Sequence, residues 1–173
     1  VSIQSPSGTD LKVDIDFESF HKDTGLIHEK GGFGNLPAGE SDGAATNARG
    51  TLVVDSFPVS GKGAELELKD NKVVAYRGEE GTDLEEGLNN IECAKNVAEL
   101  GIGTNPEASV IGNPLEDEKV LGTVHVAIGD NSSYLSGSRA VECEVHWDAV
   151  CERPTVWFDD EKVIDEGEPV FLD

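Results

Sequence analysis

Basic residues are scarce in this chain. Lysine and arginine together number 13, against 35 aspartate and glutamate residues, and the formal net charge is −22 at pH 7. So negative a surface repels phosphate groups, which makes nucleic acid and anionic membranes poor partners. The acidic residues are spread along the chain beside ordinary apolar segments, as in a folded core with an acidic coat. Such a coat indicates adaptation to high salt, where charge repulsion is screened, and we expect a halophilic origin.

Long apolar runs and methionine are also missing. No apolar stretch approaches the ~20 residues of a membrane span, and the N-terminus lacks the basic-then-apolar pattern of a signal peptide. These absences predict a cytoplasmic protein without membrane contact. Because methionine is absent altogether and the chain begins at Val1, we expect it to be a segment cut or processed from a longer protein.

Cysteines are few and form no recognisable pattern. The three of them are Cys93, Cys143 and Cys151. They contain no C-x-x-C pair and leave an odd residue over, so neither a zinc ribbon nor a disulfide scaffold is indicated. We expect buried, reduced thiols.

Alternation of apolar and polar residues dominates what is present. It runs through "LKVDIDF" (11–17), "RGTLVVDSFPV" (49–59) and "AELELKDNKVVAYRG" (64–78), where "KDNK" predicts a hairpin turn. The length suits one domain, residues 1–173. The predicted fold class is α+β, a mainly β domain with a mixed or barrel-like sheet and one substantial helix at about residues 82–100.

That helix rests on apolar residues spaced three and four apart between Thr82 and Leu100. Thr82 and Glu85 form a candidate capping box, and Gly101 is a candidate stop. A shorter helical turn is expected around residues 107–111. The Gly-rich stretch 28–50 reads as one long irregular loop, and loops of that length are usually functional or mobile.

Chemistry is concentrated in "VECEVHWDAV" (141–150). His146 and Asp148 are two residues apart, so on a strand they share a face. His125 lies in a second apolar strand, "GTVHVAIG". A lone histidine there is more often a core residue than a ligand, but two imidazoles and a carboxylate suit Zn, Co, Mn or Fe(II) with open positions for catalysis. We interpret the acidic pairs of "LEDEK" (115–119) and "WFDDEK" (157–162) as solvated turns.

Four motifs in order resemble a known family. They are "GNLPAGE" (34–40), "NVAELGIGTNP" (96–106), "LEDEKVLGTVHVAIGDN" (115–131) and "VHWD" (145–148). Together they are similar to the C-terminal part of the aminopeptidase T or leucyl aminopeptidase family of two-metal exopeptidases, over residues 30 to the C-terminus. The resemblance implies two divalent ions (Zn, Co or Mn) and a set of five metal ligands, Glu40, Glu99, His125, His146 and Asp148.

The activity implied by the resemblance is hydrolysis of an N-terminal peptide bond by a metal-activated water, with Glu40 or Glu99 relaying the proton. The chain departs from the family in three respects. The family tyrosine, seven residues after the histidine of G-T-x-H, falls on Ser132, and Tyr134 is its candidate replacement. The sequence after Glu40 differs from the family's V-F-x-A-P. The family's N-terminal α/β domain is not in this chain, so we expect that domain as a partner, together with a peptide substrate and a possible homodimer.

Two other functions stay open. Ring-cleaving dihydroxypyridine dioxygenases are similar to this family and hold one Fe(II) with two histidines and an aspartate, here His125, His146 and Asp148. A catalytically degenerate paralogue would bind metal without peptidase activity. The presence of Glu40 and Glu99 favours two metals, because five ligands exceed what a facial triad requires.

Overall fold

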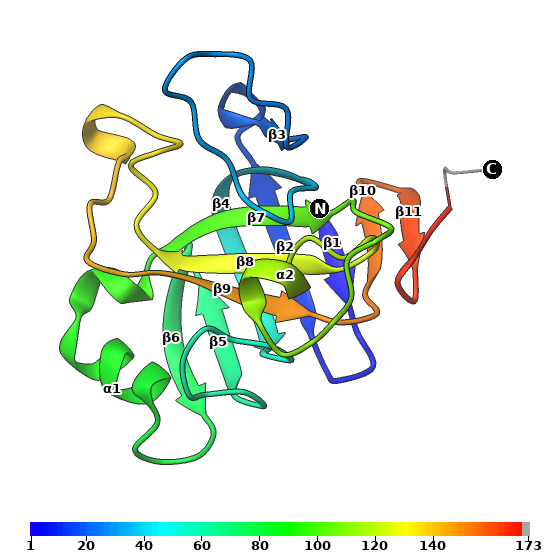
Figure 1. Cartoon of the computed structure of the whole chain (residues 1–173). Coiled ribbons are helices and arrows are strands. Elements are labelled where there is room, and N and C mark those ends of the chain that lie inside the picture. The colour runs from blue at the N-terminus through cyan, green and yellow to red at the C-terminus, as the bar shows by residue number, and fades with distance from the viewer. Residues whose placement is uncertain (171–173) are drawn as a thin grey trace.

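A computed structural model of the protein describes residues 1–170 and is mainly β. Twelve strands form one sheet, and every pair of named strands is antiparallel. The strands are β1 (Ser2–Gln4), β2 (Asp10–Ile15), β3 (His21–Asp23), β4 (Glu40–Val53), β5 (Glu65–Lys69), β6 (Lys72–Arg77), β7 (Val97–Gly103), β8 (Val124–Gly129), β9 (His146–Cys151), β10 (Thr155–Phe158), β11 (Glu161–Asp165) and β12 (Glu168–Pro169). The helices are η1 (Phe17–Ser19), α1 (Asp83–Asn90), η2 (Glu92–Lys95), α2 (Pro114–Asp117) and η3 (Gly137–Arg139). Figure 1 shows β7, β8 and β9 side by side.

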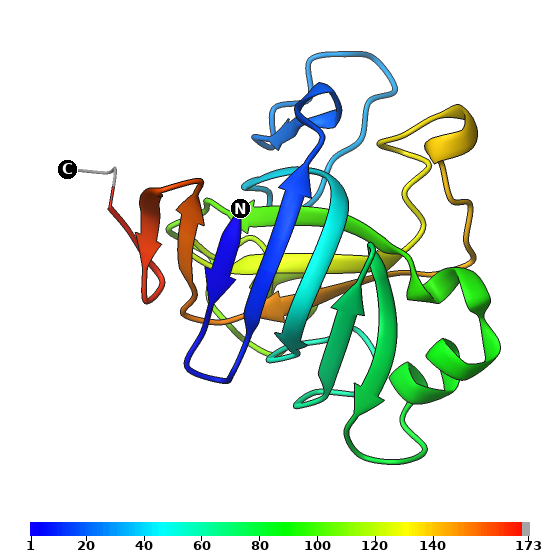
Figure 2. The ribbon, with the colours of Figure 1, turned by 180° about the vertical axis from the view of Figure 1, so that it is seen from behind.

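The sheet curls because β4 is long and bent. The first part of β4 pairs with β3 and β7, and its second part pairs with β2 and β5. The register with β2 shifts near Asn47, whose φ of 53° is left-handed, as in a β-bulge that bends a strand. Figure 2 shows this strand curving between its neighbours. At the far side, Val150 of β9 and Ser56 exchange backbone hydrogen bonds of 3.0 and 3.2 Å, so the two ends of the curl meet around the core.

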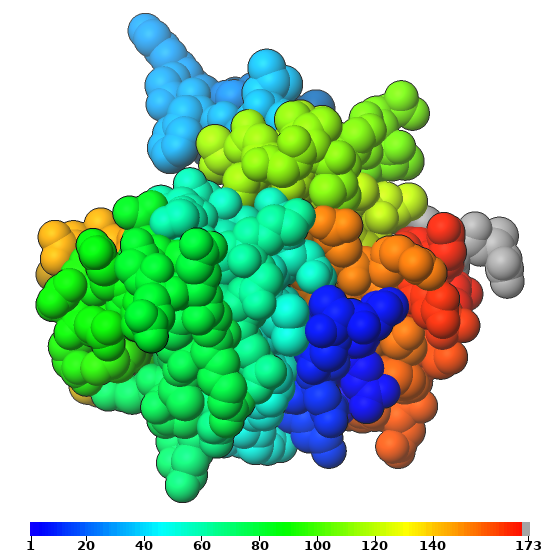
Figure 3. Space-filling view, turned by 90° about the horizontal axis from the view of Figure 1, so that it is seen from below, coloured from blue at the N-terminus to red at the C-terminus, as the bar shows by residue number. Residues whose placement is uncertain are grey.

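The predicted irregular stretch 28–50 is therefore only partly irregular. It ends at Gly39, and Glu40 begins β4. The stretch "ESDGAATNARG" contains many small and polar residues, which have little strand preference by themselves, and pairing with β3, β7 and β2 overrides that preference. The residues around 20–40, light blue in Figure 3, stand out from the body of the molecule.

The predicted helix begins where expected and ends early. Thr82 is the N-cap of α1, its hydroxyl accepting from the Glu85 N–H at 3.3 Å, while the Glu85 carboxylate accepts from the Gly81 N–H at 2.7 Å. The helix stops at Asn90, so the expected extension to Leu100 and the stop at Gly101 are wrong. Of the apolar residues that follow, Ala94 lies in η2, and those from Val97 onward belong to β7, which is buried almost throughout. A short buried strand cannot be distinguished from a buried helix by periodicity alone.

The shorter helical turn is also displaced. It lies at Pro114–Asp117, with Asn113 as its N-cap and proline in its first turn, rather than around 107–111. Of the helices within residues 1–170, none combines the length and the apolar character that crossing a lipid bilayer requires.

The expectation of three reduced thiols is wrong for two of them. Cys93 and Cys143 form a disulfide, with Cα atoms 5.6 Å apart, and Cys151 is a buried free thiol as expected. Fifty residues separate the bonded pair in sequence. Their proximity is created by the pairing of β7, β8 and β9, which spacing along the chain does not reveal.

The turn of the β5–β6 hairpin has a structural role beyond the turn itself. Asp70 and Asn71 both adopt left-handed φ values, 51° and 63°, as the "KDNK" pattern predicts for a two-residue hairpin. The Asn71 side chain accepts from the Ala48 N–H at 3.1 Å and donates to the Val97 carbonyl at 2.8 Å. It therefore ties β4 to β7.

Replacing Asn71 by glycine keeps the turn and removes these bonds. We expect Asn71→Gly to lower the free energy of unfolding by about 1–3 kcal/mol, because a largely enclosed backbone N–H loses its acceptor. Denaturant unfolding in molar salt measures this change. Asp70→Gly is the matched control at the other left-handed position, and an equal effect there would contradict the role of the side chain.

Candidate metal centre

The strand register places six acidic or imidazole side chains on one face of β4, β7, β8 and β9. Residues paired across antiparallel strands share a face, and each of the six is opposite a glycine or an alanine on at least one neighbouring strand. The pairs are Glu40 with Gly103, Asp42 with Gly101, Glu99 with Ala44 and Ala127, His125 with Gly101, Asp148 with Ala127, and His146 with Gly129. We call these six side chains the polar face. At Gly101 the small partner leaves room for the ring of His125, because a Cβ there would lie 2.1 Å from Nε2.

The opposite side of the same strands forms the core. Leu100, Val126 and Ile128 are fully buried there, as the alternation in "GTVHVAIG" requires. His125 is only 1% exposed, yet it belongs to the polar face and not to this apolar layer. His125 is therefore not a histidine packed in the apolar core, although it is buried.

Glu99 lies at the centre of the polar face. One of its oxygens, Oε1, is 3.1 Å from Nε2 of His125, and the other, Oε2, is 3.0 Å from Nε2 of His146. Nε2 of His146 is also 3.6 Å from Oδ1 of Asp148, and Nε2 of His125 is 3.6 Å from Oε2 of Glu40. The structure thus brings all five predicted metal ligands together. Glu99, His146 and Asp148 offer ligand atoms that all lie within 4.8 Å of one another.

A cavity of about 200 Å³ opens over these groups. All six side chains proposed for the site from sequence line it: Glu40, Glu99, His125, Tyr134, His146 and Asp148. Burial, together with the charges of Glu99 and Asp42, raises the pKa of Tyr134 above its ordinary value, so its hydroxyl stays protonated. The convergence is observed, and the role of each residue as a ligand or catalyst stays a prediction.

The sequence interpretation missed two residues of this cavity, Glu118 and Lys119. Lys119 is 1% exposed, and its Nζ is 2.5 Å from Oε1 of Glu40 and 2.5 Å from Oε1 of Glu118. The interpretation of "LEDEK" as a solvated turn is therefore wrong, whereas Asp159 and Asp160 of "WFDDEK" do lie in an exposed turn. No local sequence pattern distinguishes these two residues from an exposed charged turn, because their burial comes from contacts with Glu40, which is distant in the chain.

Acidic side chains outnumber basic ones in and beside this cavity. Five carboxylates face one lysine: Glu40, Asp42, Glu99, Glu118 and Asp148 against Lys119. Burial by itself would lower the pKa of both histidines, but Glu99 raises that of His125 to about 10, and Asp148 with Glu99 raises that of His146 to about 11. Burial and the charge of Asp148 raise the pKa of Glu118 to about 7. Without a bound cation, protons on His125, His146 and Glu118 compensate the negative charge of the carboxylates.

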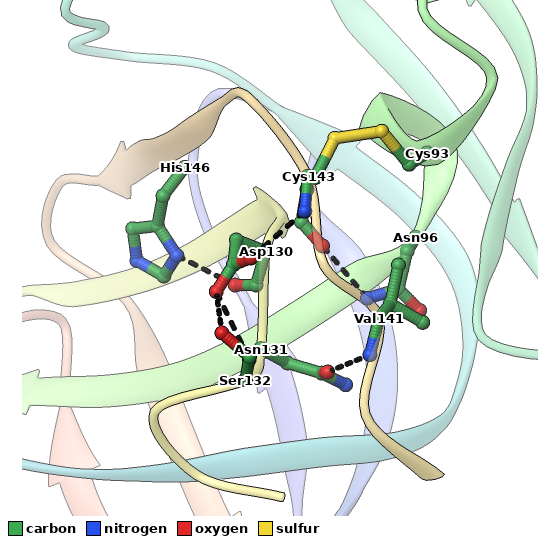
Figure 4. Close-up of a disulfide and its surroundings, with 9 residues drawn as sticks. Cys93, Asn96, Asp130, Asn131, Ser132, Val141, Cys143 and His146 are labelled. Atoms are coloured by element: carbon green, nitrogen blue, oxygen red, sulfur yellow. Dashed lines mark hydrogen bonds between the residues drawn. A yellow bond between two sulfur atoms is a disulfide. The ribbon is translucent and has the colours of Figure 1, made fainter. Parts of the chain in front are cut away.

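The donor set fits divalent cations. Carboxylates and imidazoles are the ligands of Zn, Co, Mn and Fe(II) sites, and buried charge must be paired. The ring of His146 is oriented for this, because its Nδ1 donates to the Asp130 carbonyl at 2.8 Å (Figure 4). Its Nε2 is then left 3.0 Å from Oε2 of Glu99. Nδ1 of His125 is buried and finds no hydrogen-bond partner within residues 1–170.

Gly101 makes space for the imidazole of His125. A Cβ added at Gly101 would lie 2.1 Å from Nε2 of that ring. We expect Gly101→Ala to displace the ring and weaken divalent-metal binding at least about tenfold, measured by calorimetric titration with Zn²⁺ in molar salt. Gly34→Ala is the control, because the added methyl would meet only Ile27 at 3.7 Å. Unchanged affinity in Gly101→Ala would remove His125 from the ligand set.

The raised pKa values predict how the stability of the metal-free protein depends on pH. The histidines stabilise the folded state below their unfolded pKa of about 6.5, and this is lost as pH rises through about 10 and 11. The contribution of Glu118 is likewise lost between about 4.5 and about 7. The pKa of Glu99 is lowered, so the stabilisation that its charged form contributes is lost only as pH falls below the ordinary pKa of a glutamate. Thermal unfolding of chelator-treated protein at constant molar salt should show Tm falling from pH 5 to pH 10.

The matched variant for this experiment is Glu118→Gln, which should flatten the fall between pH 5 and pH 7 and leave the fall at higher pH. A Tm that rises with pH in the metal-free protein would contradict the electrostatics described above. Saturating divalent cation should remove most of the dependence above pH 7, because it replaces the protons on the imidazoles.

The fold is similar to those of two proteins of known structure. No protein-family model matches the chain, and no curated protein matches it by sequence. The structure is similar to that of 2,5-dihydroxypyridine dioxygenase from Pseudomonas putida KT2440, with a TM-score of 0.77 and 18% identity, covering 98% of this chain and 54% of that one. It is also similar to AmpT, aminopeptidase T, from Thermus thermophilus, with a TM-score of 0.72 and 23% identity, covering 98% of this chain and 49% of that one. The chain therefore spans about half the length of both enzymes and shares their fold over that half.

Proposed function

We propose that this chain is the metal-binding part of a metal-dependent aminopeptidase, which hydrolyses N-terminal peptide bonds with two divalent ions, Zn, Co or Mn. One observation carries the proposal: the two oxygens of Glu99 face two different imidazoles, 3.1 Å from His125 and 3.0 Å from His146. Glu40 adds a carboxylate beside His125, and Asp148 adds one beside His146. Such a set offers ligands for two cations with Glu99 between them.

Bound ions of this kind supply an activated water and polarise the substrate carbonyl. The chain's own residues would hold and move the proton. Glu99 is engaged by both histidines, and Glu40 is paired with Lys119. Glu118 also contacts Lys119, through Oε1, but its Oε2 is buried and has no hydrogen-bond partner in the part of the chain that the structure describes. We therefore assign proton relay to Glu118, in place of Glu40 or Glu99, with its pKa of about 7 suited to that task.

Tyr134 would stabilise charge on the substrate, and Lys119 would hold two carboxylates in place. Tyr134 lines the same cavity as Glu99, and its protonated hydroxyl can donate to an oxyanion that forms at the substrate carbonyl. Lys119, held between Glu40 and Glu118 at 2.5 Å from each, fixes both carboxylates. Tyr134 thus fills the role that the family gives to a tyrosine at the position of Ser132.

A second cavity, of about 360 Å³, adjoins the first and would receive the substrate. The two share Asn35, Glu40 and Tyr134. The Asp42 carboxylate, only 6% exposed, lies at its inner side, and Leu26, Ile27 and Phe33 form apolar parts of its wall. A peptide N-terminus can place its ammonium group near Asp42 and its first carbonyl near the polar face.

The runner-up function is a mononuclear Fe(II) ring-cleaving dioxygenase. It is favoured by the similarity to the 2,5-dihydroxypyridine dioxygenase fold, and His125, His146 and Asp148 would form its facial triad. In that function neither Glu40 nor Glu99 is needed for metal binding. A degenerate metal-binding paralogue would keep the ions and lack hydrolysis.

Metal content separates these functions. Protein purified in molar salt and equilibrated with Zn²⁺ or Co²⁺ should contain close to two ions per chain by elemental analysis, and Glu99→Gln should contain about one or none, because both proposed ions share Glu99. A single iron, retained in Glu99→Gln, would favour the dioxygenase.

Hydrolysis tests the activity directly. The protein should release nitroaniline from amino-acyl nitroanilides, and Glu118→Gln should lower kcat by roughly 10²-fold to 10⁴-fold with its metal content unchanged. His146→Ala in parallel should lose both metal and activity. Equal rates in the parent and in His146→Ala would rule out the assignment of His146, and full metal loading without hydrolysis would leave the degenerate paralogue.

A further inference from the structure

The Cys93–Cys143 disulfide lies two hydrogen bonds away from the imidazole of His146. The Cys143 N–H donates to Oδ2 of Asp130 at 2.8 Å, and the carbonyl of the same Asp130 accepts from Nδ1 of His146 at 2.8 Å. Figure 4 shows Asp130 between the disulfide on one side and the His146 ring on the other. The disulfide thus borders the groups that orient a proposed metal ligand.

Asp130 is held from several directions. Its Oδ1 accepts from the N–H and the hydroxyl of Ser132, at 2.9 and 2.7 Å, and its N–H donates to the Val145 carbonyl at 2.8 Å. Two of its contacts, those with Cys143 and Val145, come from the irregular segment 140–145 that leads into β9. The position of Asp130 therefore depends on where that segment lies.

The disulfide is the covalent anchor of this segment. Cys143 belongs to it, and Cys93 lies in η2, which directly precedes β7. The bond therefore joins the lead-in to the strand of Glu99 with the lead-in to the strand of His146 and Asp148. A crosslink at this place holds one half of the polar face against the other.

The disulfide is not enclosed in the core. Both cysteines are only partly buried, and Cys93 lines an open cavity of about 500 Å³ together with Asn96, Val141 and Glu144. A structural disulfide of a core would be enclosed. In reducing compartments, disulfides are usually transient and often sense redox state.

We propose that Cys93 and Cys143 form a redox switch of the metal centre, an inference that rests on the proposed metal function of His146 and Asp148. A dithiol reduces the bond: one of its thiolates attacks a protein sulfur, the S–S bond breaks to give a mixed disulfide and one protein thiol, and the second thiol of the reductant displaces the other. The products are two protein thiols and the oxidised dithiol. The freed segment 140–145 then loosens Asp130, and His146 loses its fixed orientation.

The effect is selective for one half of the site. His146 and Asp148 lie on β9, which follows the freed segment, whereas His125 and Glu40 lie on β8 and β4. Loss of a group that orients a metal-binding histidine costs roughly 10-fold to 100-fold in metal affinity. Reduction therefore weakens one of two ions about tenfold and leaves the other nearly unchanged.

Cobalt titration tests the switch without using activity. Co²⁺ binding is followed by visible absorption in three samples: oxidised protein, protein reduced with a dithiol that is then removed under anaerobic conditions, and the double variant Cys93→Ser with Cys143→Ser. The last two should show the same loss of affinity for one ion. Hydrogen exchange should show faster exchange of the Cys143 and Asp130 amides in both.

Three further variants complete the test. Cys151→Ser, which removes the buried third thiol, should leave oxidised and reduced titrations as in the parent sequence. Asp130→Ala removes the carboxylate that accepts from the Cys143 N–H but keeps the carbonyl that contacts His146. It should lower the affinity for the same ion while the disulfide stays intact. Val73→Ala, in β6 and away from the metal centre, tests whether a general loss of stability changes cobalt binding.

Unchanged cobalt affinities after reduction, verified by thiol counting, would overturn the switch. So would a thiol count of three in natively purified protein, or a fall in affinity that Val73→Ala reproduces at the same Tm. If the oxidised protein binds only one Co²⁺, the two-metal function fails, but a redox-dependent affinity of that one ion would still support the switch.

Discussion

The cross-strand register of β4, β7, β8 and β9 is the constraint on which the site depends. Each charged or imidazole group of the polar face has a glycine or an alanine beside it on a neighbouring strand. The effect of a small partner is clearest at Gly101, where a Cβ would collide with the imidazole of His125. A slip of one residue in any of these pairings would turn that strand's groups into the apolar core, so the packing of Leu100, Val126 and Ile128 on the other face keeps the ligands in place.

The second constraint on the site is its buried negative charge. The carboxylates around Glu99 outnumber the single lysine, Lys119, and a buried anion is tolerated only with a partner. Protons on His125, His146 and Glu118 supply that partner in the absence of a cation, as their raised pKa values show. In the proposed function, folding, proton binding and metal binding would be coupled at this site. Asp130 contacts both the His146 ring and the backbone of Cys143 in the disulfide.

Several features of the fold and site could be predicted from local patterns. The alternation in "VHWD" and "GTVHVAIG" placed His146, Asp148 and His125 on strands, and the turn at "KDNK" and the start of the helix at Thr82 followed from short-range signals. The end of that helix could not be predicted, because spacings of three and four also occur in a strand that is buried on both faces, such as β7. The strand beginning at Glu40 was missed because its small and polar residues acquire their strand geometry from neighbours.

By itself, the sequence determined a mainly β chain with an acidic coat, and it identified a set of metal-type ligands, since periodicity, charge and motif order are properties of short segments. Only the tertiary structure decided that Glu40, Glu99, His125, Tyr134, His146 and Asp148 share one cavity, that Glu118 and Lys119 belong there, and that Cys93 meets Cys143. These contacts join residues far apart in the chain. They depend on strand pairing and curl, which bring distant segments together through the burial of the apolar face and not through any signal within each segment.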